Sequence, residues 1–253
     1  MSDASPLRVE RDGELLRITL SRPDRRNALD AELIAALTAA FSDVGDARAV
    51  MFSGEGESFC AGADVQWMRA AAELSYEENV ADSTRLRRMY EAIDRCPAPV
   101  VAPVQRHALG GGIGLVCCCD AVVAADDAVF AFSEVKLGII PAVISPFALA
   151  RIGQSAARRY FVTGERFDAA TALRIGLVHE VVAPDGLDAA VDRIVAEIGT
   201  AGPEAARHAK RLVLDAPLDG LETARRIAER RTSEEGQEGL HAFLERRKPG
   251  WTD

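Results

Sequence analysis

The hydrophobic pattern of the chain changes from short alternating runs to long helical periods. Residues 7–11 and 15–20 are apolar-rich runs separated by an Asp-Gly pair, and together they predict a hairpin of two strands. Asp30 precedes apolar positions spaced three to four apart over residues 31–41, which is typical of a capped helix. Residues 49–53 predict a third strand, and a glycine-rich loop follows it.

The middle of the chain predicts strands and helices in turn. Residues 66–95 are polar with helical spacing, and residues 97–104 (PAPVVAPV) predict a strand entered through prolines. Residues 108–120 (ALGGGIGLVCCCD) predict a glycine turn that opens a buried helix. Residues 121–141 then predict strand, turn, strand and loop, and residues 145–182 predict short helices before a last strand, LVHEVV.

The final third of the chain predicts helices only. Residues 187–199, 203–214 and 218–247 have a 3.6-residue period and no strand signal. A strand-rich front followed by a helical tail predicts an α/β fold of repeated strand–strand–helix units. We expect a core over residues 1–200 and a helical C-terminal segment over residues 201–253.

Composition narrows the classes of protein that fit this pattern. Apolar residues make up 48% of the 253 and charged residues 27%, as in an ordinary globular protein. No apolar run reaches the ~20 residues of a membrane helix, so we expect no membrane partner. The net charge of −9 argues against a nucleic-acid partner. The first ten residues lack the basic start and apolar stretch of a secretory signal, which favours a cytoplasmic protein.

The five cysteines predict buried apolar side chains rather than a site. Three of them are consecutive, and no pair has the two-residue gap of a zinc knuckle. Disulfides are unusual in a cytoplasmic chain. We therefore expect neither a disulfide framework nor a metal centre.

Two glycine-rich loops are candidates for chemistry. One is Ala61-Gly62-Ala63-Asp64, and the other is Gly110-Gly111-Gly112 at the start of the predicted buried helix. Glycine allows a ligand to approach the backbone closely, and a helix N-terminus presents unpaired N–H groups. One N–H group from each loop could hold an oxyanion. Phosphate binding competes with this interpretation, but the Rossmann and P-loop spacings are both missing.

Taken together, these loops and their flanks resemble the enoyl-CoA hydratase/isomerase (crotonase) family. The segments that carry the resemblance occur in order along nearly the whole chain: RPDRRNAL (22–29), SFCAGADV (58–65), HALGGGIGL (107–115) with the following Asp120, SEVKLGIIP (133–141), TGERFDAATALRIGLVHEVV (163–182) and GLHAFLERRKPGW (239–251). The resemblance implies a crotonase-like spiral of strand–strand–helix turns. It also implies a homotrimer or homohexamer, with the helical C-terminal segment involved in trimerisation.

The resemblance implies a particular role for each glycine loop. The backbone N–H groups of Ala63 and Gly111 would hold the thioester oxygen of an acyl-CoA, in agreement with the interpretation from the residues. Arg26 would lie near the CoA phosphates, and Arg246 would reach a phosphate of the neighbouring subunit's CoA, with plain surface charge as the alternative for both. The implied CoA-binding surface of the two loops comprises Ala61, Gly62, Ala63, Asp64, Val65, Gly110 and Gly111.

Hydratases of the family typically carry two glutamates, and this chain has only one of them. The first position is Gly114 here, and the second is Glu134. Adding water to an enoyl thioester needs a base for the water and an acid for the α-carbon, so Glu134 serves as both in turn or another group helps. A double-bond isomerase needs a single carboxylate. The alternative for Glu134 is a structural carboxylate, but its place beside the GIIP loop favours a cleft.

The loop after Glu134 points to a more specific substrate. PAVISP (141–146) replaces the glycine-rich stretch of common hydratases, and its larger side chains are predicted to reshape the acyl pocket. The stretch resembles bacterial methylglutaconyl-CoA hydratases of leucine breakdown and related hydratases of acyclic terpene breakdown, which tend to have a small residue at the first glutamate position. The predicted acyl pocket comprises Trp67, Met68, Gly114, Pro141, Ile144 and Ser145.

Three further polar residues have both a functional and a structural interpretation. On a strand, Lys136 would share a face with Glu134 and could meet a second substrate carboxylate, but a structural lysine is the favoured interpretation. His107 could assist water, although a hydrogen-bonded structural histidine is favoured. Ser145 could bind water or substrate, or could cap the helix that follows.

Three functions remain open from the sequence. The leading one is an enoyl-CoA hydratase for a short or branched acyl group such as methylglutaconyl-CoA. The second is an enoyl-CoA delta isomerase with Glu134 as its sole acid/base, and the third is a CoA-thioester-binding protein with little catalysis. None implies a metal or redox cofactor, since coenzyme A enters as part of the substrate.

Overall fold

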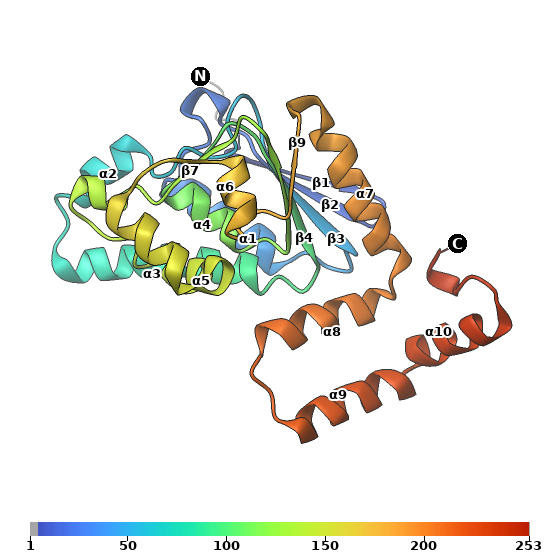
Figure 1. Ribbon diagram of the computed structural model, residues 1–253. Helices are drawn as coiled ribbons and strands as arrows, with labels where there is room; N and C mark the ends of the chain where they lie inside the picture. The colour runs from blue at the N-terminus through green and yellow to red at the C-terminus, as the bar shows by residue number, and fades with distance from the viewer. Residues whose placement is uncertain (1–4, 253) are drawn as a thin grey trace.

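The computed structural model, which describes residues 5–252, has a mixed α/β fold with two sheets (Figure 1). The larger sheet has the strand order β1-β2-β3-β4-β6-β9. Its first pair is the predicted antiparallel hairpin, and every other pair is parallel. Its strands are β1 (Leu7–Asp12), β2 (Leu15–Leu20), β3 (Ala49–Gly54), β4 (Val100–Val104), β6 (Ala121–Ala125) and β9 (Glu180–Val182).

The smaller sheet completes the predicted strand–strand–helix turns. It has the order β5-β7-β8, with β5 at His107–Leu109, β7 at Val129–Ala131 and β8 at Phe167–Asp168. The chain passes from β4 to β5 and then into a helix, and it repeats this path from β6 to β7. An isolated bridge between Cys60 and Ala108 continues the smaller sheet toward the preceding turn. The spiral predicted from the sequence is therefore present.

Ten helices and four short 3-10 turns are found among residues 5–252. The helices of the core are α1 (Ala31–Ser42), α2 (Val65–Ala71), α3 (Tyr76–Asp94), α4 (Gly111–Cys117), α5 (Ser145–Thr163), α6 (Ala169–Arg174) and α7 (Leu187–Thr200). The C-terminal helices are α8 (Pro203–Leu214), α9 (Gly220–Thr232) and α10 (Glu234–Glu245). The 3-10 turns are η1 (Pro23–Arg25), η2 (Glu134–Leu137), η3 (Pro184–Gly186) and η4 (Gly250–Thr252).

The hydrophobic core lies on both faces of the larger sheet. On one face α1, α3, α4 and α5 pack together over the main cluster. All the non-glycine residues of α4 are buried in this cluster. On the other face α7 covers β4 and β6 through Leu187, Ala190 and Val191. Capping fixes where the long helices begin, as when Asp30 accepts a hydrogen bond from Leu33 N at 2.9 Å. All five cysteines are buried and free, as predicted.

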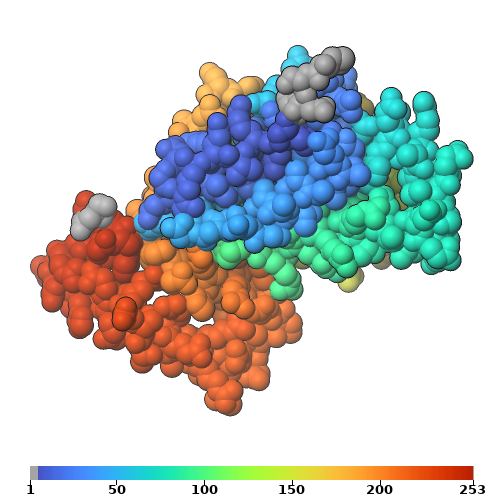
Figure 2. Space-filling model, turned by 180° about the vertical axis from the view of Figure 1, so that it is seen from behind, coloured from blue at the N-terminus to red at the C-terminus, as the bar shows by residue number. Residues whose placement is uncertain are grey.

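The C-terminal helices differ from the core in burying few side chains. Figure 2 shows α8 to α10, in orange and red, as a lobe that projects from one corner of the molecule. Lys210 on α8 ties this lobe to the core, because its Nζ lies 2.7 Å from Asp120 Oδ2. The periodic stretch 218–247 forms two helices rather than one, since Ser233 is extended and its hydroxyl caps α10.

Two other expectations about elements need correction. The last strand is shorter than LVHEVV, because Leu177 and Val178 are buried side chains of the turn after α6 and pairing starts at Glu180. Ser145 does not cap α5. It is the first residue of that helix, and its hydroxyl donates to Ala142 O at 2.8 Å.

Candidate active site

A cavity of about 320 Å³ lies between the two glycine loops, α2, α3, η2 and the start of α5. It collects most of the predicted site from six separate segments of the chain. Sequence-predicted residues on its wall are Ala61, Gly62, Ala63, Trp67, Met68, Gly110, Gly111, Glu134, Pro141 and Ile144. Further wall residues that the sequence reasoning missed include Leu29, Asn79, Asp82, Ser83, Leu86, Tyr90, Ser133, Leu137, Ile139 and Ile140.

The two glycine loops pack backbone against backbone at this cavity. Cys60 N donates to His107 O at 2.9 Å, and Leu109 N donates back to Cys60 O at 3.1 Å. Gly62 has a φ of +99°, and a side chain there would come within 2.8 Å of the Leu109 carbonyl oxygen. A Cβ atom on Gly112 would lie only 2.3 Å from Cys60 O. Glycine is therefore required at both positions by close approach of the backbones.

Each loop has an unpaired N–H group on a residue that lines the cavity. Ala63 and Gly111 both line the cavity, and within residues 5–252 neither of their N–H groups has a protein acceptor. One neighbour of each is paired, since Asp64 N donates to Leu29 O at 2.8 Å and Gly110 N donates to Ala131 O at 2.9 Å. The N–H groups of the other neighbours, Gly62 and Gly112, have no acceptor within residues 5–252. Two preorganised N–H donors on one cavity can stabilise negative charge on a substrate oxygen.

Glu134 faces the same cavity from the first residue of η2. Its Oε2 atom is buried and has no hydrogen-bond partner in the described chain. Burial raises the pKa of this carboxyl above its ordinary value, with a smaller opposing contribution from a backbone hydrogen bond. A buried carboxyl without a partner and with a raised pKa is suited to accepting and returning a proton.

The strand geometry expected around Glu134 is not found. Lys136 lies with it on a 3-10 turn rather than on a strand, because the chain leaves β7 at Ala131. Lys136 is exposed and does not line the cavity, in line with the favoured structural interpretation. His107 also has a structural partner, since its Nδ1 lies 3.0 Å from Ser58 Oγ, and burial lowers its pKa.

The space beside Gly114 is filled, and Gly114 itself does not line the cavity. A Cβ atom at this position would lie 2.5 Å from Ile144 Cγ2 and 2.9 Å from Tyr90 Cε1. Even alanine would be crowded there, so this arrangement leaves no room for a second glutamate. Tyr90 was missed in the sequence because helical spacing predicts only that it faces inward, not which residue its ring contacts.

Asp82 is the other carboxylate on the cavity wall, and it lies on α3 about two turns from Tyr90. It precedes Tyr90 by eight residues on α3, roughly 12 Å at 1.5 Å per residue. Its Oδ1 accepts a hydrogen bond from Arg85 at 2.8 Å. No lysine or arginine of the described residues lines the cavity.

Besides Gly114, five predicted residues lie outside the cavity wall. Arg26 is exposed, and its carbonyl accepts a hydrogen bond from Ala61 N at 3.0 Å, so it is beside the first loop. Asp64 caps α2 by accepting from Gln66 N and Trp67 N, which makes its side chain structural. Val65 is 66% exposed. Arg246 caps the distant helix α10, and Ser145 bonds within its own turn.

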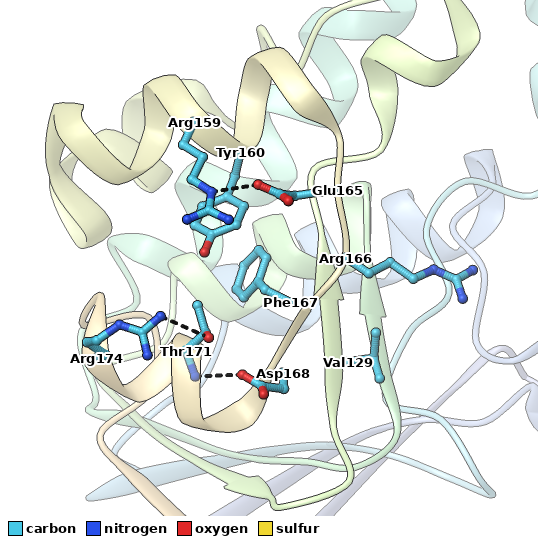
Figure 3. A pocket seen from close by; sticks show the side chains of 9 residues that line it. All are labelled: Val129, Arg159, Tyr160, Glu165, Arg166, Phe167, Asp168, Thr171 and Arg174. Atoms are coloured by element: carbon cyan, nitrogen blue, oxygen red, sulfur yellow. Dashed lines mark hydrogen bonds and ion pairs between the residues drawn. The ribbon is translucent and has the colours of Figure 1, made fainter.

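A second and larger hollow, of about 520 Å³, contains none of the predicted site residues (Figure 3). Its polar groups largely bind one another. Arg159 Nε donates to Glu165 at 2.6 Å, and Asp168 accepts from Thr171 N at 2.8 Å. Arg166 points away from the other residues drawn. The smaller cavity, where free N–H groups and a buried carboxyl converge, is therefore the candidate active site.

Two searches of the described residues complete this description. Residues 5–252 hold no cluster of three or more His, Cys, Asp or Glu side chains placed to bind a metal ion. No helix in that range is both long and apolar enough to span a membrane.

Comparison with known proteins assigns the family. The profile of the enoyl-CoA hydratase/isomerase family matches residues 10–253. An enoyl-CoA hydratase of Alternaria alternata, AKT6-1, is 32% identical over 92% of this chain and 79% of its own. The chain belongs to the enoyl-CoA hydratase/isomerase family and is an enzyme of this kind.

Solved structures agree with this assignment. The crystal structure of an enoyl-CoA hydratase from Shewanella pealeana has a TM-score of 0.92 and 39% identity, covering 97% of this chain and 96% of that one. Pseudomonas aeruginosa AtuE has a TM-score of 0.93 and 36% identity, covering 98% of this chain and all of the other. The crotonase fold expected from the sequence is thereby confirmed.

Proposed function

We propose that the protein is an enoyl-CoA hydratase for a short or branched acyl group. The N–H groups of Ala63 and Gly111 hold the thioester oxygen, and Glu134 transfers the proton. The observation that carries the proposal is the convergence of two unpaired N–H donors and one unpartnered carboxyl oxygen on a single cavity. These groups match the charge that develops when a nucleophile adds to an enoyl thioester.

The proposed steps use one carboxylate twice. The Glu134 carboxylate takes a proton from water while the water oxygen bonds to the β-carbon. The electron pair of the double bond moves toward the thioester oxygen, where the Ala63 and Gly111 N–H groups stabilise the enolate. Protonated Glu134 then returns its proton to the α-carbon, so one water is added and the enzyme is regenerated. A raised carboxyl pKa makes the Glu134 carboxylate a stronger base, which favours the first proton transfer, from water.

The direct test is turnover of two substrates by the purified protein. Crotonyl-CoA and 3-methylglutaconyl-CoA are incubated with the enzyme and the loss of enoyl-thioester absorbance is followed. We expect turnover of the branched substrate, abolished in Glu134→Gln. An intact protein that hydrates and dehydrates no acyl-CoA of this kind would overturn the proposal.

We further propose that branching of the acyl group is recognised, as in methylglutaconyl-CoA. Trp67, Met68 and Ile144 supply an apolar wall for a branch. Among the described residues, this wall has no cation that could pair with the second carboxylate of methylglutaconyl-CoA. Asp82 would repel that carboxylate. Comparing 3-methylglutaconyl-CoA with 3-methylcrotonyl-CoA, which has the branch without the charge, separates the two features. Exclusive use of the charged substrate would require a cation from outside this cavity wall.

An isomerase is the second candidate, because a single carboxylate stands beside the two N–H donors. Glu134 could remove a proton from the α-carbon of a 3-enoyl-CoA and return it to the γ-carbon. Product analysis after incubation with a 3-enoyl-CoA in deuterated water distinguishes the candidates. A 2-enoyl product without added water favours isomerisation. A 3-enoyl-CoA that stays unchanged, when the matching 2-enoyl-CoA is hydrated by the same enzyme, favours hydration.

We also infer that the chain assembles as a homotrimer or homohexamer through residues 201–253. The support is the apolar surface of the C-terminal helices, where Phe243 is 81% exposed and Val213 is 75% exposed. Light scattering should give three or six times the 27.1 kDa chain mass, and Phe243→Ser should lower it. A monomer at micromolar concentration would contradict this inference.

We also propose that the protein works in the cytoplasm. The five buried free thiols support a reducing compartment of this kind.

A further inference from the structure

Tyr90 links α3 to the first turn of α4 at the centre of the candidate site. Its side chain is fully buried, and its ring packs near Phe147 with centroids 5.9 Å apart. Its hydroxyl donates a hydrogen bond to the Gly111 carbonyl oxygen at 2.8 Å. Tyr90 also lines the cavity, so this bond is formed beside the proposed oxyanion donor.

Gly111 is held through the peptide units on both sides of it. The unit that carries its N–H group is anchored within α4, because Ile113 N donates to the Gly110 carbonyl oxygen at 3.1 Å. The preceding residue, Gly110, has φ 48° and ψ −118° and offers no side-chain cap to α4. Gly110 N is anchored to Ala131 O on one side at 2.9 Å. On the other side, the Tyr90 hydroxyl is the side-chain group that holds the Gly111–Gly112 peptide unit, through the Gly111 carbonyl oxygen.

We propose that Tyr90 is a positioning residue for Gly111. By holding the Gly111 carbonyl oxygen, it fixes the Cα atom that also carries the donor nitrogen, so that the Gly111 N–H group faces the thioester oxygen. The same ring, with Ile144, occupies the space beside Gly114 where typical hydratases of the family would carry their first glutamate. The ring of Tyr90 therefore fills the space of a second carboxylate, and its hydroxyl fixes an oxyanion donor. This inference rests on the proposed role of Gly111.

The hydroxyl is a permanent donor at neutral pH. Burial is the main reason that the pKa of Tyr90 lies well above its ordinary value, and nearby thiols and Glu134 raise it further. A phenol that stays protonated donates to a carbonyl throughout the working range of the enzyme.

The test compares Tyr90→Phe with a matched control, Tyr160→Phe. Tyr160 is also buried but lies on α5 at the second hollow, away from Gly111. For Tyr90→Phe we expect kcat to fall about tenfold, the size of a lost neutral hydrogen bond, with KM changed less than about twofold. Tyr160→Phe should leave both unchanged.

Infrared spectroscopy gives a readout that loss of packing alone would not move. Butyryl-CoA labelled with ¹³C at the thioester carbonyl is bound to each protein, and its carbonyl stretch is compared with that of the free ligand. In the wild type the stretch should move to lower frequency, and in Tyr90→Phe it should move part of the way back. An identical stretch in wild type and Tyr90→Phe would overturn the inference about Tyr90.

The outcomes separate this inference from the proposed function. If the wild type itself leaves the carbonyl stretch unchanged, the oxyanion role of Ala63 and Gly111 fails, and the Tyr90 inference fails with it. If Tyr90→Phe does not fold, fluorotyrosine at position 90 keeps the ring volume and alters the acidity of the hydroxyl. The carbonyl stretch should then differ from the wild type, and an unchanged stretch would count against Tyr90.

Discussion

The two walls of the cavity differ in whether their buried polar side chain has a hydrogen-bond partner. On one wall Glu134 sits on a short 3-10 turn, with a buried carboxyl oxygen that has no partner, next to the exposed side chains of Leu137 and Ile140. On the other wall Tyr90 is fully buried, its hydroxyl is paired, and its ring presses on Gly114. The first wall keeps a buried carboxyl oxygen without a partner, whereas the buried hydroxyl of the second wall is hydrogen-bonded.

This difference indicates that one wall carries the chemistry and the other positions the backbone donors. An unpaired carboxyl costs folding free energy, and such groups persist where they carry chemistry. Close packing on the opposite wall costs nothing comparable and fixes the backbone donors to within a small displacement. Changes on the Glu134 wall should therefore alter rate more than stability. Changes on the Tyr90 wall should alter stability and geometry first.

The largest expected effect comes from removing the charge of Glu134. Glu134→Gln keeps the shape of the side chain but cannot take a proton, so kcat should fall about 100- to 10,000-fold. Glu165→Gln is the matched control, because Glu165 binds Arg159 at the second hollow and lies outside the active cavity. Steady-state kinetics on a substrate that the wild type turns over measures both. Equal losses in the two variants would mean that Glu134 has no special role.

The second prediction removes one backbone donor. Ala63→Pro removes the N–H group at this position. The change breaks no hydrogen bond within the protein, because the Ala63 N–H group has no acceptor among residues 5–252. Loss of one oxyanion donor typically lowers kcat about 100- to 1000-fold. Ala31→Pro is the control, since it puts a proline at the first position of α1, where helices tolerate it. An Ala63→Pro variant that folds and retains full activity would rule out this donor.

A smaller effect is expected from crowding the Tyr90 wall. Gly114→Ala pushes a methyl group against Ile144 and Tyr90, which should lower the free energy of unfolding by about 1–3 kcal/mol. Gly199→Ala is the control, because a Cβ atom there meets nothing within 4 Å and the residue lies within α7. That helical substitution should stabilise the protein by about 0.5–1 kcal/mol.

A double variant tests whether the crowding is local. Adding Ile144→Ala to Gly114→Ala removes the closest atom, so the combined loss in denaturant unfolding should be smaller than the sum of the single losses. Additive losses would show that the Gly114 environment is less tightly packed than the distances indicate.

The sequence predicted the local features of the site better than its long-range contacts. The two glycine loops, the buried helix after Gly110 and a cleft position for Glu134 all follow from residues next to one another in the chain. Lys136 would share a face with Glu134 only on a strand, and this alternative does not hold because β7 ends before Ser133 and the chain turns. Hydrophobic period alone does not distinguish a strand end from a 3-10 turn over four residues.

Tyr90 is the residue that sequence reasoning had no means to find. Its contacts with Gly111 and Gly114 join positions more than 20 residues apart, and they exist only once α3 packs on α4. The missing glutamate was visible at Gly114, but what fills its place depends on tertiary packing. The same limit applies to the apolar face of α10, where exposure of Phe243 could be measured only on the folded chain.

The smallest expected effect concerns stability rather than rate. The pKa of Glu134 is raised in the folded protein, so the folded state holds this proton more tightly than the unfolded state does. As pH rises from the unfolded value near 4.5 through the folded pKa, the unfolded chain ionises first, and the free energy of unfolding falls. Glutamine has no proton to lose, so Glu134→Gln should gain stability over the wild type as pH rises from 4 to 8. Urea unfolding of both proteins across this range measures the gap, with Glu165→Gln as the carboxyl whose pKa is lowered instead. A gap that stays constant with pH would mean that the Glu134 wall carries no electrostatic cost, and the contrast between the two walls would then rest on packing alone.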